Sequence, residues 1–89
     1  SGSSQSPQVF LRSLEQLSQA IKQNRSASIQ AISFRAGVVD IRLTAPDVTT
    51  LDNIQRAISQ NGQFKATIQS TDQDGDKVNS RIQIQAGGA

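Results

Sequence analysis

The chain has 89 residues, of which 35% are hydrophobic and 18% are charged, and it contains neither cysteine nor histidine. A chain of this length forms one small domain, and without cysteine it has no disulfide cross-links. Nine basic and seven acidic residues give a net charge of +2, and the basic residues are scattered along the chain. The clustered basic patch of a nucleic-acid-binding domain is therefore missing from the sequence.

A first helix is predicted from Pro7 to Gln23. Proline is favoured at the first helical position, where no backbone hydrogen bond is lost, and Ser6 before it is a suitable cap. Val9 and Leu11 lie on the flanks of an apolar stripe at helical spacing. The stripe consists of Phe10, Leu14, Leu17 and Ile21.

Two strands joined by a tight turn are predicted next, over residues 28–35 and 39–45. The second strand alternates apolar and polar residues, which is typical of a strand with one buried face. The Ala36-Gly37 pair between the strands predicts a β-hairpin. The alternation in the first strand is imperfect: Ile32 and Phe34 share one face, and Ile29 and Ala31 fall on the other.

The second half of the chain repeats this order. Asp47, after Pro46, is a suitable N-cap for a second helix, and Asn61-Gly62 ends that helix in a left-handed conformation. The apolar stripe of the helix consists of Leu51, Ile54 and Ile58.

Two more alternating segments predict the remaining strands. The third strand runs from Phe64 to Ser70, with Phe64, Ala66 and Ile68 facing inward. Residues 72–76 are predicted to be a loop, and in the fourth strand Val78, Ile82 and Ile84 face inward.

The order helix, strand, strand, helix, strand, strand predicts an α+β fold. We expect a ferredoxin-like, circularly permuted domain with a four-stranded sheet and both helices on one face. The second and fourth strands are expected to be central and parallel to each other, with the other two at the edges. Residues 1–5 are interpreted as a tag or linker remnant, 6–86 as the domain and 87–89 as a flexible C-terminus.

The sequence favours a protein that is not an enzyme and holds no metal or cofactor. No histidine or cysteine is available for nucleophilic or acid–base chemistry, and no serine lies in a nucleophile-elbow context. The only acidic cluster is Asp72, Asp74 and Asp76. A calcium loop needs glycine at its sixth position and glutamate at its twelfth. Here Gly75 is fourth and Gln83 is twelfth, so a solvated loop is favoured.

An RNA-binding sheet is the first alternative, because ferredoxin-like sheets often bind RNA. Such modules stack bases on aromatic residues of the open face, but this chain has no tyrosine or tryptophan and its three phenylalanines fit the core. Arg42 and Arg81 point outward on the expected central strands. With Asp40 beside them, they favour a solvated sheet surface.

The predicted edge strand 28–35 is the strongest candidate for an interaction site. Edge strands usually carry charges, proline or a bulge that prevents pairing, and residues 28–34 have neither charge nor proline. The functional interpretation is pairing with another domain by strand addition. The alternative, which stays open, is that a twist or bulge brings Ile29 and Ala31 into the core. The candidate partner-binding residues are Val9, Leu11, Ile29, Gln30, Ala31, Ile32 and Ser33.

The sequence also resembles a known family. The run 32–47 (ISFRAGVVDIRLTAPD), the segment from Leu51 to Ile58 and the final 81–84 (RIQI) are similar to the C-terminal periplasmic domain of type II secretion system protein L. The resemblance extends over nearly the whole chain from about Phe10. It consists of hydrophobic positions and turns rather than catalytic signatures.

This resemblance implies a periplasmic domain of an inner-membrane protein in a Gram-negative bacterium, with its membrane anchor upstream. It also implies a non-catalytic interaction domain that forms homodimers and pairs with the periplasmic domain of protein M. Three alternatives have similar architecture: protein M itself, a BON-type envelope domain that contacts phospholipid, and an ACT-type domain that binds an amino acid. An ACT domain usually begins with a strand, whereas this chain begins with a helix.

Overall fold

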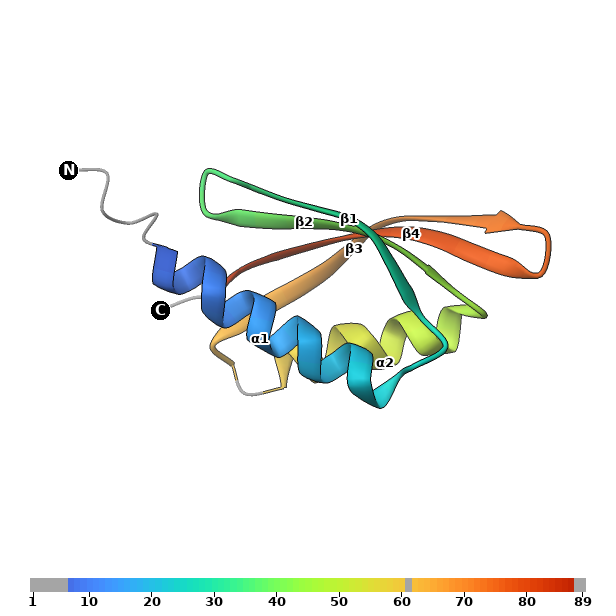
Figure 1. Cartoon of the computed structure of the whole chain (residues 1–89), viewed down its shortest axis with the longest axis horizontal. Coiled ribbons are helices and arrows are strands. Elements are labelled where there is room, and N and C mark those ends of the chain that lie inside the picture. The colour runs from blue at the N-terminus through green and yellow to red at the C-terminus, as the bar shows by residue number, and fades with distance from the viewer. Residues whose placement is uncertain (1–6, 61, 88–89) are drawn as a thin grey trace.

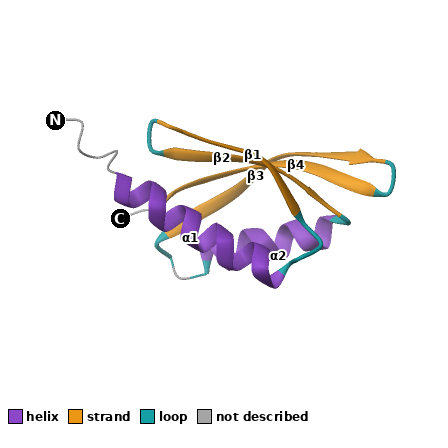
Figure 2. Ribbon diagram, viewed as in Figure 1, coloured by secondary structure: helices purple, strands orange, loops and turns teal. Residues whose placement is uncertain are grey.

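The computed structural model describes residues 7–60 and 62–87, with side chains from Phe10 onward. Its strands form one sheet in the order β1-β2-β4-β3, and both helices lie on the same face of that sheet (Figures 1 and 2). This arrangement confirms the predicted α+β fold. The elements are α1 (Pro7–Gln23), β1 (Ser28–Arg35), β2 (Val38–Ala45), α2 (Val48–Ser59), β3 (Phe64–Asp74) and β4 (Lys77–Ala86).

The two central strands are antiparallel, so the prediction that they are parallel was wrong. In the ladder between β2 and β4, Val38 pairs with Gln85 and Ala45 pairs with Val78. The reason is topological. The α2 helix returns the chain along the sheet, so β3 runs in the same direction as β2, and the β3–β4 hairpin then reverses the chain once more. Because β4 lies between β2 and β3, every neighbouring pair in the sheet is antiparallel.

The core lies between the sheet and the two helices. The inward residues of β2 and β4 are almost fully buried, and Ile41 lies opposite Ile82 at the centre. From α2 the core receives Leu51, Ile54 and Ile58, and from α1 Leu17 and Ala20. The helical and strand periodicities predicted these residues to face inward, except Ala20. In α1, Ala20 is buried, whereas Phe10, Leu14 and Ile21 of the predicted stripe are only partly buried.

Local signals explain the start of α2 and the turn that follows it. The Asp47 carboxylate accepts hydrogen bonds from the Thr50 hydroxyl and backbone N–H, at 2.7 and 2.8 Å, as predicted for an N-cap. Both hydrogen bonds lower the pKa of the Asp47 carboxyl, and the bond from the Thr50 hydroxyl has the larger effect. Gly62 has φ +76°, which agrees with the predicted left-handed turn. Asn61, the other residue of that prediction, lies outside the described residues.

A bulge in β1 changes the face to which Ile29 belongs. The pairing register with β2 shifts between Ile29 and Ala31, which leaves Gln30 as the extra residue. Ile29 therefore pairs with Leu43 and lies on the helix-facing side, whereas Ala31 pairs with Arg42 on the open side. The prediction that both fall on the outer face was wrong for Ile29, because a bulge reverses the alternation of side chains.

The predicted loop at residues 72–76 is mostly strand. Pairing between β3 and β4 continues to Asp74 and Lys77, so only Gly75 and Asp76 form the turn. Gly75 has φ +63°, a conformation that glycine adopts without strain. The aspartates in this segment led to the prediction of a loop, because aspartate is excluded from buried strands. The solvent-exposed end of a hairpin tolerates it.

The β1–β2 turn gives a stability prediction. Its two residues, Ala36 and Gly37, both have positive φ, +52° and +79°, and Ala36 is strained there because of its Cβ. Asparagine tolerates this conformation and is favoured before glycine in such turns. We expect Ala36→Asn to raise the free energy of unfolding by about 0.5–1 kcal/mol in urea denaturation. The same substitution at Ala31, outside the turn, should give no gain; equal effects would contradict the strain argument.

Candidate functional site

The candidate site is the border between α1 and β1, where the helix layer covers the sheet incompletely. The α1 helix packs chiefly against α2. It reaches β1 through Phe10, whose ring lies 4.8 Å from that of Phe34, centroid to centroid. Phe10, Leu14 and Ile21 are only partly buried. This border is therefore an apolar surface that remains open to solvent.

Helix geometry places Leu11 on this border. Successive residues of an α-helix are rotated by about 100°, which places Leu11 beyond Leu14 on the flank of α1 that carries Phe10. The opposite flank carries glutamines that line the groove with α2, among them Gln16 and Gln23. Leu11 is 61% exposed, as expected for a side chain beyond the edge of the packed interface.

The candidate residues on β1 divide between the two faces of the strand. Ile29 and Ile32 point toward the helix side and are 37% and 40% exposed. Ala31 and Ser33 lie on the open side, and Gln30 occupies the bulge, with its side-chain amide 3.4 Å from the Thr44 hydroxyl. Ile29 and Ile32 thus share the helix-facing side of β1, and we use the name α1–β1 seam for these two residues together with Leu11 of α1. The side chain of Val9 lies outside the described residues.

The two edges of the sheet differ in how far they are blocked. At the β3 edge, α2 side chains satisfy the backbone of Ala66: the Ser59 hydroxyl accepts from its N–H, and the Gln55 amide donates to its carbonyl, both at 3.0 Å. Lys65 and Asp72 also place charges on β3. In the described structure β1 has no such cap from a helix, and its only charge is Arg35 at the end. Each edge strand also carries one bulge, at Gln30 in β1 and at Gln69 in β3. The charges and the α2 cap therefore make the difference, and they leave the β1 edge the more accessible one for strand addition.

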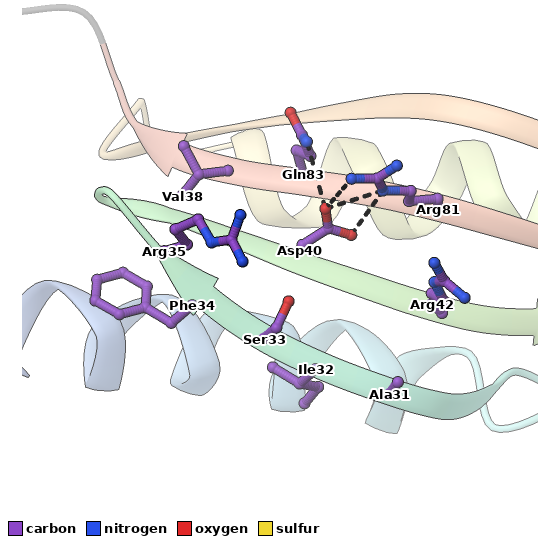
Figure 3. Close-up of a pocket in the computed structure, with 10 residues that line it drawn as sticks. All are labelled: Ala31, Ile32, Ser33, Phe34, Arg35, Val38, Asp40, Arg42, Arg81 and Gln83. Carbon is purple, nitrogen blue, oxygen red and sulfur yellow. Dashed lines mark hydrogen bonds and ion pairs between the residues drawn. The ribbon is translucent and has the colours of Figure 1, made fainter.

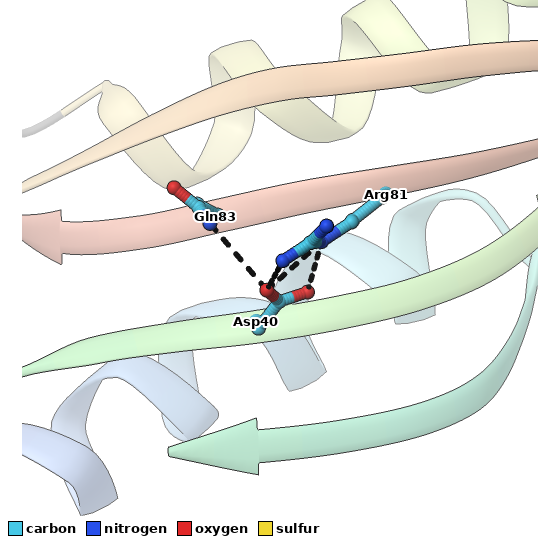
Figure 4. A network of polar contacts seen from close by, with 3 residues as sticks. All are labelled: Asp40, Arg81 and Gln83. Atoms are coloured by element: carbon cyan, nitrogen blue, oxygen red, sulfur yellow. Dashed lines mark hydrogen bonds and ion pairs between the residues drawn. The ribbon is translucent and has the colours of Figure 1, made fainter. Parts of the chain in front are cut away.

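The open face of the sheet carries a polar network (Figure 4). The Arg81 Nε donates to both Asp40 carboxylate oxygens at 2.9 Å, and the Gln83 amide donates to one of them at 3.4 Å. The hydrogen bond from Arg81 holds the pKa of the Asp40 carboxyl below its usual range, against an opposing effect of burial. Because both side chains are solvent-accessible, this pair contributes little stability. It does fix the direction of the Arg81 side chain.

A shallow trough of about 480 Å³ surrounds this network. Figure 3 shows its lining from β1, β2 and β4. Small side chains on β1, Ala31 and Ser33, leave room between the larger ones. Three arginines border the trough: Arg35, Arg42 and Arg81. The sequence predicted that Arg42 and Arg81 share this face with Asp40; Arg35 was missed, because its contribution depends on the hairpin register.

The described part of the chain has neither a candidate metal-binding group nor a candidate membrane-spanning helix. Residues 7–60 and 62–87 contain no group of three or more acidic, histidine or cysteine side chains arranged to hold a metal ion. Neither described helix has the length and apolar composition of a membrane span. What the described surface offers is an apolar seam and an arginine trough, both suited to contacts between proteins.

Comparisons with known proteins agree with this fold. A model of the GspL periplasmic domain family matches residues 9–86. The crystal structure of the periplasmic domain of XcpY aligns with a TM-score of 0.77 and 26% identity, covering 84% of this chain and 97% of that chain. The periplasmic domain of EpsL from Vibrio parahaemolyticus aligns with a TM-score of 0.72, covering 85% of this chain and 92% of that one, and its 14% identity supports the fold alone. No curated protein sequence gives a significant match.

The family match extends over most of the chain and includes α2, all four strands and α1 from residue 9 onward. It confirms the resemblance to protein L of type II secretion systems and decides against the BON-type, ACT-type and protein M alternatives. The family also places the domain in the periplasm of a Gram-negative bacterium. The chain belongs to the GspL periplasmic domain family, a component of type II secretion systems.

Proposed function

We propose that this domain is a non-catalytic interaction module of the inner-membrane secretion platform, which pairs with a second copy and with the periplasmic domain of protein M. The α1–β1 seam is the proposed contact surface. The observation that carries the proposal is the open β1 edge with Ile29 and Ile32 exposed beside it. Burial of these side chains by a partner would be favourable, at about 25 cal/mol per Å² of apolar surface.

Strand addition at β1 explains both features of this edge. A partner strand would satisfy the outward backbone groups of β1, which gives affinity without a specific side-chain pattern. The α1–β1 seam would supply specificity. Only a partner with apolar residues on the side that faces Leu11, Ile29 and Ile32 could cover these side chains. The same edge serves both partners, so the homodimer and the pair with protein M are mutually exclusive in this proposal.

An Ile32→Lys variant tests the seam. Lysine at this partly exposed site can extend into solvent in the free domain, but its charge would be buried on pairing. We expect the dissociation constants for self-association and for protein M to rise at least about tenfold. Sedimentation velocity measures the first and isothermal titration calorimetry the second.

The matched control is Val48→Lys. Val48 is 56% exposed but belongs to α2, so the same chemical change there should leave both affinities unchanged. Thermal melting of both variants establishes that the fold is intact. If Ile32→Lys folds normally and still associates like the unmodified domain, the seam is not the contact surface.

A further inference from the structure

The arginine trough reaches the outer edge of β1 and is continuous there with the α1–β1 seam. Ala31 and Ser33 line the trough from the open side of the strand, and Ile32, a residue of the seam, borders it as well (Figure 3). An extended segment that paired with the β1 edge would therefore lie against both surfaces at once. Its side chains would alternate between the trough and the seam.

The open face beside this edge carries positive charge that is only partly compensated. Arg81 pairs with Asp40, whereas neither Arg35 nor Arg42 forms a salt bridge within the described structure. Asp72 borders an adjoining hollow of about 410 Å³ together with Arg42 and Arg81. The two hollows are thus bordered by three arginines and two aspartates, which leaves a net charge of +1.

Arg35 lies out of reach of Asp72. Arg35 pairs with Val38 on β2, whereas Asp72 pairs with Asn79, which pairs with Thr44 on β2. Val38 and Thr44 are six residues apart, which corresponds to about 20 Å along the strand. The carboxylate inside the trough is already engaged by an arginine of β4. The uncompensated charge therefore lies toward the β1–β2 turn, at the exposed edge of the sheet.

Side chains of an added strand could reach both unpaired arginines. One would lie directly beside Arg35, since cross-strand neighbours on one face have Cβ atoms about 5 Å apart. Arg42 lies two strand spacings away, about 10 Å, and the residue between is Ala31, whose small side chain leaves this space open. Aspartate or glutamate at these positions would form charge-assisted hydrogen bonds with the guanidinium groups. On its other face, the same strand would need apolar residues to cover Ile29 and Ile32.

A second copy of the chain does not offer this pattern. Strand β1 contains no acidic residue, and Arg35 lies on its open side. Two antiparallel β1 strands paired about Ser33 would place Arg35 of each copy beside Ala31 of the other, next to Arg42. Like charges would then meet over the trough, which opposes self-pairing.

We propose that the arginine trough makes the β1 edge selective for a partner strand in which apolar and acidic residues alternate, with the acidic side chains over Arg35 and Arg42. This inference rests on the proposed strand addition at β1. It predicts that the periplasmic domain of protein M supplies such a strand, and that charge favours this pairing over self-pairing. The preference declines as salt screens the arginines.

A double variant, Arg35→Gln with Arg42→Gln, tests the selectivity. The Kd for protein M at low salt should rise about fivefold, as the loss of two exposed ion pairs implies, and should depend less on salt. Self-association should tighten, because like charges are removed. Isothermal titration calorimetry gives the first constant and sedimentation velocity the second. An unchanged Kd for protein M, or an equal rise in both constants, would overturn the proposal.

The matched control is Lys65→Gln with Lys77→Gln. Both lysines lie on the open side of the sheet, on β3 and β4, so this variant removes the same total charge away from the β1 edge. We expect both constants to stay unchanged. A rise in the Kd for protein M equal to that of the arginine variant would show a general effect of net charge and overturn the proposal.

An Ile29→Gln variant separates this inference from the proposed function. Ile29 borders neither hollow and the substitution changes no charge, so it reports on the seam alone. If Ile29→Gln weakens pairing with protein M and the arginine variant does not, strand addition stands and the acidic pattern is wrong. If neither variant weakens it, the proposed function fails as well. Melting curves of all variants verify folding.

Discussion

Ile82→Ala is expected to lower the free energy of unfolding by about 2–5 kcal/mol, the range for truncation of a fully buried isoleucine. Ile82 is 1% exposed and lies opposite Ile41 at the centre of the sheet. Removal of three carbons there leaves a cavity that neither a helix nor a neighbouring strand can fill without breaking other contacts. Urea denaturation followed by circular dichroism measures the change.

This loss is large compared with the total free energy of unfolding expected for the domain. A small domain without cross-links has a net stability of only about 3–5 kcal/mol, so Ile82→Ala is expected to leave little folded protein at room temperature. Ile82→Val, with an expected loss of about 0.5–1.5 kcal/mol, keeps the comparison measurable. Gln85→Ala, on the exposed side of the same strand, is the control. A loss for Ile82→Ala no larger than that for Gln85→Ala would contradict the assignment of the core.

Ala66→Leu is expected to lower the free energy of unfolding by about 1–3 kcal/mol through overpacking. Ala66 is 2% exposed, and α2 is held close to it by the hydrogen bonds from Gln55 and to Ser59. A larger side chain would separate α2 from β3 and break both bonds. Chemical denaturation of the variant gives the magnitude.

The control for this prediction is Thr67→Leu, one residue along the same strand. Thr67 pairs with Gln83 and lies on the open face, where space is not limited, so we expect a change within about 0.5 kcal/mol. An equally small change for Ala66→Leu would contradict close packing of α2 against β3. It would also contradict the conclusion that α2 blocks the β3 edge.

Most of the fold could be predicted because the local signals agree with one another. The bounds of α1, the N-cap of α2 and the β1–β2 hairpin follow from capping residues, periodicity and turn chemistry. The direction of β4 relative to β2 could not be read from any local pattern, because each strand alone fits either orientation. Only the path of the chain through α2 and the β3–β4 hairpin determines it.

The candidate site was harder to predict, for a related reason. The spacing of three between Ile29 and Ile32, followed by two to Phe34, is itself the signal of a bulge within a strand. Read in this way, it would have placed all three residues on the helix side. The arginine trough depends on pairing across strands distant in sequence, so no local pattern contains it. Its charges are visible in the sequence, but their positions are not.

The most direct test of the central claim is an NMR titration of the isotope-labelled domain with the unlabelled periplasmic domain of its cognate protein M. The account predicts that shifted amide signals concentrate along residues 28–34 and the first turns of α1, while signals of β3 change little. Saturating shifts centred on β3 or on α2 would contradict the seam as the contact surface. An absence of shifts at high concentration of protein M would contradict the proposed pairing itself.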